Sequence, residues 1–415
     1  MHERLILPNG VRIVYEHMPF VRTAAVGISV GVGSRDEKRS EGGFAHFIEH
    51  MLFKGTAHYS AAELAGAMDS VGGQYNAYTT RENTAFYARV LDEHLDTAID
   101  LLREMFFLSK FDDADVENER GVINEEIDMY DDTPEDVAVE RLVGGCFPGA
   151  LGRPVLGTPK TLENATGAAL RAFMTEHYRA GCIVVALCGS FEDRHLRRLE
   201  EIFSAMPRTR MKKHAKAEYT PCLRLRKKAT EQNHLCIGFP GIPAGSEERF
   251  AANLFNTILG GGMSSRLFQT VREQHGLCYS IASFSCGFAD TGFLGIETAV
   301  GRDTEEKAIR LILEEARRIL NDGITEAELS RAREQAKSAL VMALERTTTR
   351  MEMLSNAELT LGHIPDTEDL IARYMALTRE DIRAIGEKLL RFDRMSFSAV
   401  GRVESPEYYR NLLGI

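Results

Sequence analysis

A repeated order of segments in the two halves of the chain constrains the fold more than any other feature of the sequence. Four segments of the first half have a counterpart in the second, at an offset that stays between 206 and 213 residues: 44–52 with 250–258, 83–86 with 290–293, 111–116 with 324–329, and 188–189 with 400–401. In the first pair, an apolar-faced helix follows a strand in both halves. Such a steady offset indicates duplication of one α+β unit.

The length of the chain also favours two domains. At 415 residues, the chain exceeds what one hydrophobic core usually serves. Between the halves, residues 207–216 are basic and contain no acidic side chain. The basic residues are Arg208, Arg210, Lys212, Lys213 and Lys216. A solvated connector explains this run, and a binding patch is the alternative. We therefore predict domains at 1–206 and 219–415, joined by a basic linker at 207–218.

Apolar periodicity, turn residues and capping signals predict the secondary structure of the first half. Strands are expected at 5–7, 11–16, 24–32, 83–90 and 182–187. Helices are expected from about 43, from 60, at 93–108 and at 114–129. Ser60 and Glu63 form a capping box at the start of the second helix. Each half is therefore expected to be an α/β-sandwich-like domain of the α+β class, with helices layered on a mixed or antiparallel sheet.

The charge and the cysteines exclude several classes of function. A net charge of −11 argues against nonspecific nucleic-acid binding. The seven cysteines are an odd number without a CxxC pair, which favours reduced thiols over a disulfide framework, a Cys-type zinc site or a redox-thiol enzyme. The N-terminal residues lack the apolar core of a signal peptide, and no apolar run approaches the roughly 18 residues that span a bilayer. We expect a cytoplasmic protein without a membrane or nucleic-acid partner.

His46 and His50 lie four residues apart in the sequence His-Phe-Ile-Glu-His, which also contains Glu49. On a helix, this spacing places both imidazoles on one face, one turn apart, with Glu49 beside them. Two imidazole nitrogens so placed can bind one Zn²⁺, while the carboxylate acts on a water molecule next to it. The order His-x-x-Glu-His is the inverzincin motif. A helical histidine pair with a purely structural role is the alternative.

A catalytic zinc site needs a third protein ligand, and the acidic segment 117–126 can supply one. Glu119 and Glu126 are seven residues apart, so they lie on nearly the same face of a helix. One of them can bind the metal while the other holds a ligand histidine in place. This spacing leaves open which glutamate does which. The alternative, a solvated acidic face, suits Glu117 and Glu125 better.

Residues 43–56 resemble the metal-binding motif of the pitrilysin superfamily through its whole length; they read Gly-Phe-Ala-His-Phe-Ile-Glu-His-Met-Leu-Phe-Lys-Gly-Thr. This group, the inverzincin metallopeptidases of family M16, includes mitochondrial processing peptidase and insulin-degrading enzyme. The resemblance covers essentially the whole chain and is closest to the short, two-domain, processing-peptidase-like branch. In the family, the third ligand follows the second histidine by 76 positions, which implies Glu126. The supporting glutamate is then Glu119, which we count with Glu49 in the catalytic set.

The resemblance also implies roles for residues outside the metal motif. Arg272 and Tyr279 match a pair that binds the substrate carbonyl and stabilises the oxyanion. A guanidinium and a phenol are suitable donors for such a developing negative charge. Asn76 and Ala77 match the edge strand on which a substrate pairs as an added β-strand.

The second half of the chain lacks the metal ligands. Its aligned positions hold Ala252, Phe255, Asn256 and Ala339. One chain therefore offers one zinc site and one Arg/Tyr segment. Longer family members enclose a chamber with four such domains. The resemblance thus implies a homodimer, a four-domain clamshell whose composite site joins the zinc of one subunit to Arg272 and Tyr279 of the other.

The implied activity is that of a zinc-dependent endopeptidase that hydrolyses peptides or unfolded segments inside the enclosed chamber, with Glu49 as the general base. The alternative is a non-catalytic assembly subunit, or a chain that works only with a different partner, as processing peptidases do. Family members without activity lose metal ligands or the base. This chain retains His46, Glu49, His50 and Glu126.

Overall fold

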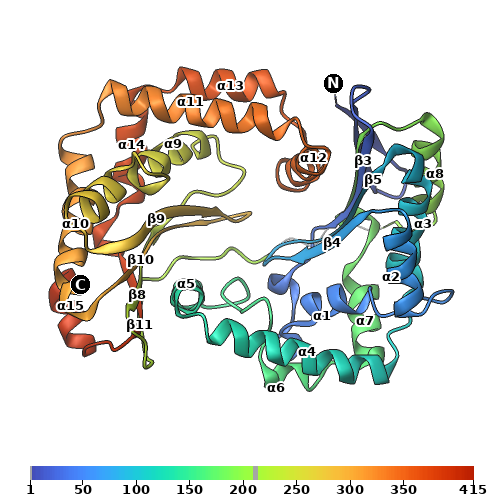
Figure 1. Ribbon diagram of the computed structural model, residues 1–415, viewed down its shortest axis with the longest axis horizontal. Coiled ribbons are helices and arrows are strands. Elements are labelled where there is room, and N and C mark those ends of the chain that lie inside the picture. The colour runs from blue at the N-terminus through green and yellow to red at the C-terminus, as the bar shows by residue number, and fades with distance from the viewer. Residues whose placement is uncertain (1, 209–213) are drawn as a thin grey trace. The chain divides into compact units, whose positions relative to one another are not determined.

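Two β-sheets with closely similar strand order form the framework of the protein (Figure 1). The computed structural model describes residues 2–208 and 214–415. The chain forms two compact units, each built around one sheet. Unit 1 comprises Met1–Ile127, Arg153–Ala215 and Val341–Pro365, and unit 2 comprises Asp128–Gly152, Lys216–Leu340 and Asp366–Ile415.

The sheet of unit 1 has the order β1-β2-β6-β3-β5-β4. Its strands are β1 (Glu3–Ile6), β2 (Arg12–His17), β3 (Thr23–Val30), β4 (Gln74–Thr79), β5 (Thr84–Leu91) and β6 (Ile183–Gly189). Only β2 and β6 run parallel, and the other neighbours are antiparallel. The central strands β3 and β6 are almost fully buried, which explains their near-continuous apolar sequences. β4 lies at the edge of the sheet.

The sheet of unit 2 repeats this topology with the order β7-β11-β8-β10-β9. Its strands are β7 (Leu223–Lys227), β8 (Asn233–Pro240), β9 (Cys278–Gly287), β10 (Gly292–Val300) and β11 (Ser396–Gly401). Its one parallel pair, β7 and β11, corresponds to β2 and β6 of unit 1. The predicted fold class of two α/β domains with mixed sheets is therefore confirmed.

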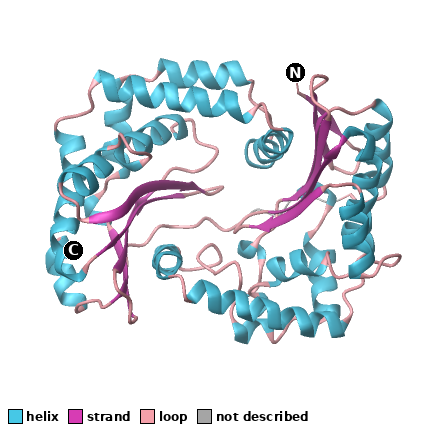
Figure 2. Ribbon diagram, viewed as in Figure 1, coloured by secondary structure: helices cyan, strands magenta, loops and turns pink. Residues whose placement is uncertain are grey.

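Helices cover both faces of the sheet in unit 1 (Figure 2). Successive side chains of a strand point to opposite faces, so Val184 and Val185 of β6 belong to different cores. Val185 packs in the larger core, to which these helices contribute: α1 (Phe44–Met51), α2 (Ala61–Ser70), α3 (Leu95–Leu108), α4 (Asp113–Asp131), α6 (Pro159–Leu162), α7 (Gly167–His177) and α8 (Asp193–Ser204). Val184 packs with Met351 and Leu354 of α12 (Thr347–Leu361) on the other face.

Unit 2 is layered in the same way. The larger core contains side chains of α9 (Arg249–Gly260), α10 (Glu305–Asn321), α11 (Glu326–Ala343), α13 (Thr367–Ala376), α14 (Arg379–Leu389) and α15 (Pro406–Leu413). On the opposite face of the sheet lies α5 (Pro134–Cys146), whose Leu142 packs with Cys236, Phe293 and Val400 of three strands.

One helix of each half packs in the unit formed mainly by the other half. α5 comes from the first half of the chain and covers the sheet of unit 2, whereas α12 comes from the second half and covers the sheet of unit 1. Each helix buries the sheet face that the other half of the chain leaves without a helix. A fully buried strand needs apolar cover on both faces, which makes this exchange necessary for both cores.

Packing thus divides the chain differently from a single boundary in the sequence. The predicted basic linker at 207–218 falls partly on residues 209–213, which lie outside the described residues, and Arg210, Lys212 and Lys213 are among them.

All seven cysteines are free thiols. Among the described residues, no helix combines the length and apolarity needed to cross a membrane.

The predicted elements of the first half match the observed ones closely. The capping box at α2 is confirmed, because the Glu63 amide donates to the Ser60 hydroxyl and the Glu63 carboxylate accepts from the Ser60 amide. The helix expected from residue 93 begins at Leu95, because a 3₁₀ turn at Asp92–His94 precedes it.

Candidate metal centre

The short helix α1 carries His46, Glu49 and His50. Its apolar face, with Phe47 and Ile48, is fully buried in the core of unit 1, so the position of the helix is defined by packing. His46 is buried and His50 is partly exposed. His50 therefore reaches the protein surface, whereas His46 stays covered.

A buried carboxylate fixes the start of this helix. One oxygen of Glu37 accepts a hydrogen bond from the Gly43 amide at 3.0 Å, and the other accepts from the Ala45 amide at 2.9 Å. Backbone amides at a helix N-terminus lack intrahelical partners, so the two oxygen acceptors of Glu37 stabilise the helix. Gly43 has a φ of 91°, and a side chain there would meet the Leu156 carbonyl oxygen at 2.7 Å. Glycine is therefore required at the entry to α1.

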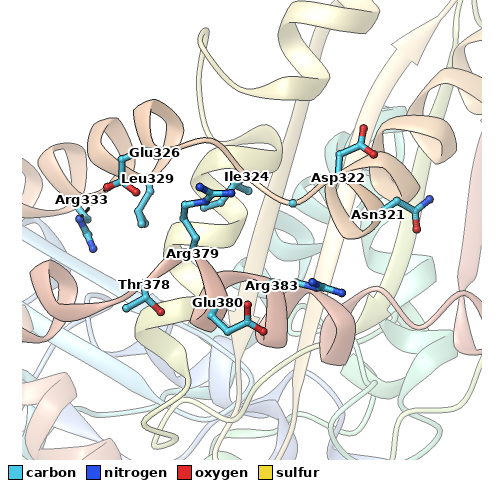
Figure 3. A pocket seen from close by; sticks show the side chains of 11 residues that line it. Asn321, Asp322, Ile324, Glu326, Leu329, Arg333, Thr378, Arg379, Glu380 and Arg383 are labelled. Atoms are coloured by element: carbon cyan, nitrogen blue, oxygen red, sulfur yellow. Dashed lines mark ion pairs between the residues drawn. The ribbon is translucent and has the colours of Figure 1, made fainter.

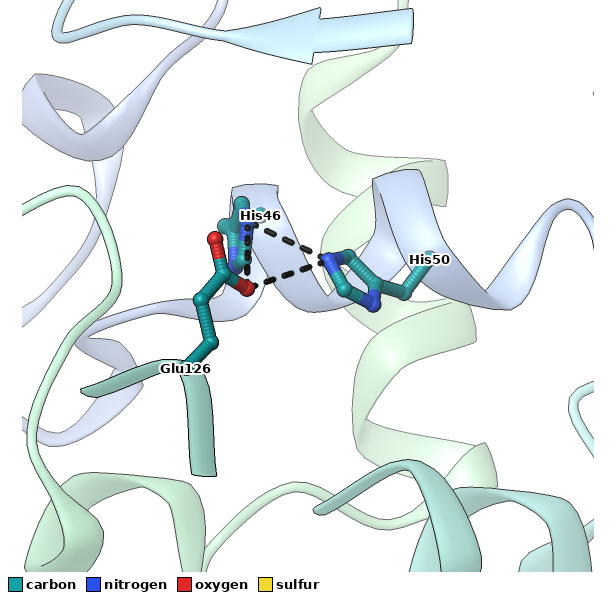
Figure 4. Close-up of side chains that lie close together, drawn as sticks. All are labelled: His46, His50 and Glu126. Atoms are coloured by element: carbon teal, nitrogen blue, oxygen red, sulfur yellow. Dashed lines mark hydrogen bonds and ion pairs between the residues drawn. The ribbon is translucent and has the colours of Figure 1, made fainter. Parts of the chain in front are cut away.

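Three potential ligand atoms converge between α1 and α4 (Figure 4). The Nε2 atoms of His46 and His50 lie 3.3 Å apart. Oε2 of Glu126 lies 3.6 Å from each of these nitrogens. Ligand atoms at about 2.0–2.1 Å from a tetrahedral zinc ion lie about 3.4 Å from one another, so the observed separations fit one ion. Two neutral nitrogens and one carboxylate oxygen are also a suitable donor set for Zn²⁺.

Glu119 orients one of these histidines. Its Oε1 lies 2.7 Å from Nδ1 of His50, and its Oε2 lies 2.6 Å from Nζ of Lys54. With a carboxylate at Nδ1, that nitrogen carries the proton and Nε2 keeps its lone pair for the metal. Burial would raise the pKa of Glu119, but the hydrogen bonds from His50 and Lys54 outweigh it and lower that pKa. Glu119 is therefore ionised and supports the ligand.

The surroundings of His46 favour its neutral form. Burial lowers its pKa to about 3, and the proximity of His50 acts in the same direction. Its buried Nδ1 has no hydrogen-bond partner among the described residues. A neutral imidazole is the form that binds a metal.

Glu49 lies next to the converging ligands without joining them. Its carboxylate accepts a hydrogen bond from the hydroxyl of Thr79, the last residue of β4. Burial raises the pKa of Glu49, and the charge of Glu126 raises it further, although Thr79 and His50 oppose the shift. A raised pKa brings a carboxylate closer to the range of a general base.

Arg272 and Tyr279 lie in unit 2 and contact each other. The guanidinium carbon of Arg272 lies 4.9 Å from the ring centre of Tyr279 and 4.6 Å from that of Phe268. Arg272 belongs to a π-helical segment at Phe268–Gln274, and Tyr279 is the second residue of the edge strand β9. Tyr279 is 81% exposed, so its hydroxyl is open to a ligand.

Asn76 and Ala77 lie on β4, at the edge of the unit 1 sheet. Ala77 pairs with Phe86 of β5, and Asn76 is exposed. Because Thr79, the last residue of this strand, bonds Glu49, the strand ends beside the candidate metal centre.

The second half has no comparable centre. Among the described residues, the one group of three potential ligand atoms that converge is that of His46, His50 and Glu126. The equivalent helix α9 instead buries Ala252 and Phe255 in the core of unit 2.

A separate cavity of about 450 Å³ in unit 2 opens between the start of α11 and the start of α14 (Figure 3). Its charged side chains are of both signs: Asp322, Glu326, Glu380, Arg333, Arg379 and Arg383. Arg333 lies 3.7 Å from Glu326 and donates to the Leu377 carbonyl. The mixture gives the cavity no clear preference for a charged ligand, and it contains no site residue predicted from the sequence.

Three residues that shape the candidate metal centre were not predicted from the sequence. Glu37, Lys54 and Thr79 contact the α1 N-terminus, Glu119 and Glu49, respectively. Lys54 lies four residues after His50 but beyond the end of α1 at Met51, so helical spacing did not indicate it. Thr79 and Glu37 reach the site only through tertiary packing and leave no local signal.

Known protein families match most of the chain. The model of the insulinase family, peptidase family M16, matches residues 12–159, and that of the peptidase M16 inactive domain matches residues 164–336. An uncharacterized zinc protease of Bacillus subtilis (strain 168) is 38% identical over 395 residues, which is 95% of this chain and 97% of that protein. An uncharacterized zinc protease of Streptomyces coelicolor is 37% identical over 420 residues, covering 98% of this chain and 91% of that protein.

Solved structures show the same fold. A peptidase M16 inactive domain from Pseudomonas fluorescens superposes with a TM-score of 0.91 at 20% identity, over 97% of this chain and 99% of that one. A protease from Helicobacter pylori superposes with a TM-score of 0.88 at 19% identity, over 96% and 99% of the two chains. From the family models and the similarity to named zinc proteases, we conclude that this chain belongs to peptidase family M16.

Proposed function

We propose that the protein is a zinc metalloendopeptidase whose metal is held, one ion per chain, by His46, His50 and Glu126. Three potential ligand atoms converge at separations of 3.3 and 3.6 Å, and Glu49 adds a further carboxylate from the helix that carries both histidines. This arrangement is the observation that carries the proposal. A structural zinc site would have four protein ligands and no such neighbouring base.

A zinc ion at this position would act as a Lewis acid toward the peptide carbonyl and make a neighbouring water more acidic. Glu49 is the general base, and takes the proton of the attacking water. Its raised pKa then lets it return the proton to the leaving amine. Thr79 holds the carboxylate in place by donating a hydrogen bond to it. Glu119 keeps Nε2 of His50 available as a ligand.

The edge strand β4 binds the substrate backbone in this proposal. On an edge strand, every second backbone amide faces away from the sheet. The Ala77 amide donates to Oδ1 of Asn76 at 2.9 Å, a local contact that a substrate carbonyl can replace. An extended peptide that pairs with β4 continues toward Thr79 and Glu49. This mode of binding requires an unfolded substrate, because a folded protein rarely offers a free strand.

Arg272 and Tyr279 supply the donors for the oxyanion. Stacking of the guanidinium on the phenol ring holds both side chains together, and the exposed hydroxyl of Tyr279 remains free to donate. We assign these residues to a composite site in a homodimer, in which Arg272 and Tyr279 of one chain complete the metal centre of the other. The dimer would form an enclosed chamber of four domains.

The decisive experiment compares Glu49→Gln with the wild type in peptide cleavage and in zinc content. We expect zinc to be retained and kcat to fall by about 10²–10⁴, the usual contribution of a general base. His50→Ala should lose both zinc and activity. Glu117→Gln, at an exposed position of α4, is the matched control and should change neither. Full activity of Glu49→Gln with zinc retained would remove Glu49 from the base role.

Mixing two inactive chains tests the shared site. Glu49→Gln and Arg272→Ala are each expected to be inactive as homodimers. After subunit exchange, a mixed dimer contains one intact pairing of base and Arg/Tyr segment, so activity should return. If exchange is confirmed by mass and no activity appears, the composite site is wrong. Cleavage that begins only when a second protein is added would instead support a partner-dependent subunit.

A further inference from the structure

Two cysteines from distant parts of the sequence meet in unit 2. Cys146 is the last residue of α5, and Cys222 immediately precedes β7. Their sulfur atoms lie 3.8 Å apart although the residues are 76 positions apart in the chain. This contact is a consequence of the exchange that places α5 on the sheet of unit 2.

Backbone hydrogen bonds hold the two thiols beside each other. The Thr220 amide donates to the Cys146 carbonyl at 2.8 Å, and the Phe397 amide donates to the Cys222 carbonyl at 3.0 Å. The Cys222 amide also donates to the Ser396 hydroxyl at 3.0 Å. The end of α5, the segment before β7 and strand β11 are therefore joined by backbone contacts. The backbones that carry the two thiols are thus held close together.

A glycine makes this close approach possible. A Cβ atom at Gly145 would lie 2.6 Å from the Cys222 sulfur and 2.6 Å from Nε of Arg224. Any larger residue there would push the segment before β7 away from α5.

The thiols differ in access: Cys146 is fully buried, whereas Cys222 is partly exposed. A small oxidant can thus reach Cys222 first.

We propose that Cys146 and Cys222 form an oxidation site, at which a peroxide converts the two thiols into a reversible disulfide that ties α5 to the sheet of unit 2. The sulfurs must close from 3.8 Å to the bond length of about 2.05 Å, a movement that side-chain rotation can supply. The site is separate from the proposed peptidase chemistry and uses none of its residues.

The charges around the pair assign the order of the reaction. The hydrogen bond with Cys146 lowers the pKa of Cys222, burial opposes this shift, and the charge of Arg224 adds to it. The pKa of Cys146 is raised, first by the same hydrogen bond and then by burial. Cys222 is therefore the thiolate that attacks, and Cys146 is the thiol that resolves.

The two steps balance with hydrogen peroxide as the oxidant. The Cys222 thiolate attacks one peroxide oxygen, the O–O bond breaks, and a sulfenic acid and hydroxide form. The Cys146 sulfur then attacks the Cys222 sulfur, the S–O bond breaks, and the thiol proton of Cys146 leaves with the hydroxyl as water. Together the thiols lose two electrons and two protons, and the peroxide becomes two molecules of water.

The disulfide would affect the segment that follows the metal centre along the chain. α4 carries Glu119 and Glu126, and α5 begins three residues after α4 ends. A covalent bond at the far end of α5 restrains the local unfolding of this helix. We therefore expect slower hydrogen exchange of the α5 amides in the oxidised protein than in the reduced protein.

The test treats the full chain, purified with zinc, with hydrogen peroxide and maps the alkylated peptides under non-reducing conditions. The expected product is one disulfide between the peptides that contain Cys146 and Cys222, and the number of alkylatable thiols falls from seven to five. Dithiothreitol should restore all seven. A different disulfide, or intact thiols at both positions while the exposed Cys286 is oxidised, would overturn the proposal.

Single substitutions test the order of attack. In Cys146→Ser, the sulfenic acid at Cys222 has no resolving thiol, so dimedone should label Cys222. In Cys222→Ser, dimedone should not label Cys146. Cys286→Ser is the matched control and should form the disulfide as the wild type does. Labelling of Cys146 in place of Cys222 would refute the assigned order of attack. Unchanged hydrogen exchange of the α5 amides on oxidation would refute the tether.

Discussion

Replacing Glu119 with alanine should weaken zinc binding while leaving every direct ligand in place. The carboxylate accepts from Nδ1 of His50 at 2.7 Å and pairs with Lys54 at 2.6 Å. Glu119 is only 4% exposed, so water does not readily replace it in the wild type. The substitution leaves the Nδ1–H of His50 without an acceptor, and the imidazole can turn or change tautomer.

The size of the effect follows from what such supporting carboxylates contribute. Loss of a hydrogen-bonded partner behind a metal-binding histidine costs about 10–100-fold in affinity. This corresponds to about 1.4–2.7 kcal/mol in binding free energy. Glu119→Gln should lie between the wild type and Glu119→Ala, because its amide oxygen still accepts from Nδ1 but carries no charge.

The assay is competition for zinc with a chromophoric chelator at constant pH and ionic strength, with circular dichroism as a check of folding. Glu117→Ala is the matched control, since Glu117 lies on the same helix and its side chain is 73% exposed. The reasoning is refuted if Glu119→Ala folds normally and binds zinc with the dissociation constant of the wild type.

Three further substitutions test the surroundings of the site and the packing of α12. Thr79→Val removes the hydrogen bond to Glu49, which is worth about 1.5–3 kcal/mol for a charged acceptor, so kcat should fall at least about tenfold with zinc content unchanged. Leu354→Ala should lower the free energy of unfolding by about 2–5 kcal/mol in urea titrations, because this side chain of α12 is fully buried against the sheet of unit 1. Gly27→Ala should destabilise by about 1–3 kcal/mol, since its Cβ would lie 2.7 Å from the Met351 sulfur; unchanged thermal stability would contradict this contact.

Local sequence patterns predicted well the helices that carry the candidate metal ligands. A spacing of four residues on a helix places His46 and His50 on one face whatever the rest of the chain does, because the pitch of the α-helix is constant. The same periodicity placed Glu119 and Glu126 on one face of α4, and the structure brings both to the histidines. Spacing alone could not distinguish their roles. Glu126 converges with both Nε2 atoms, whereas Glu119 contacts Nδ1, and the packing of α4 against α1 decides between them.

Contacts between distant segments could not be predicted in the same way. Thr79 bonds Glu49 because β4 lies beside α1, and no periodicity within either segment encodes that arrangement. The sequence spacing of the cysteines argued against a thiol pair, yet Cys146 and Cys222 are in contact. Sequence spacing is a guide to proximity only inside one element, where the backbone geometry is regular.

By itself, the sequence determined the duplicated architecture, the helix that presents His46, Glu49 and His50, and the absence of these ligands from the second half. These properties follow from residue identity and from the constant geometry of helices and strands. The tertiary structure decided that Glu126 lies near Nε2 of His50 while Glu119 lies at Nδ1, and it placed α5 and α12 in exchanged units. Those choices depend on which arrangement buries both faces of each sheet, a property of the whole chain that no single segment contains.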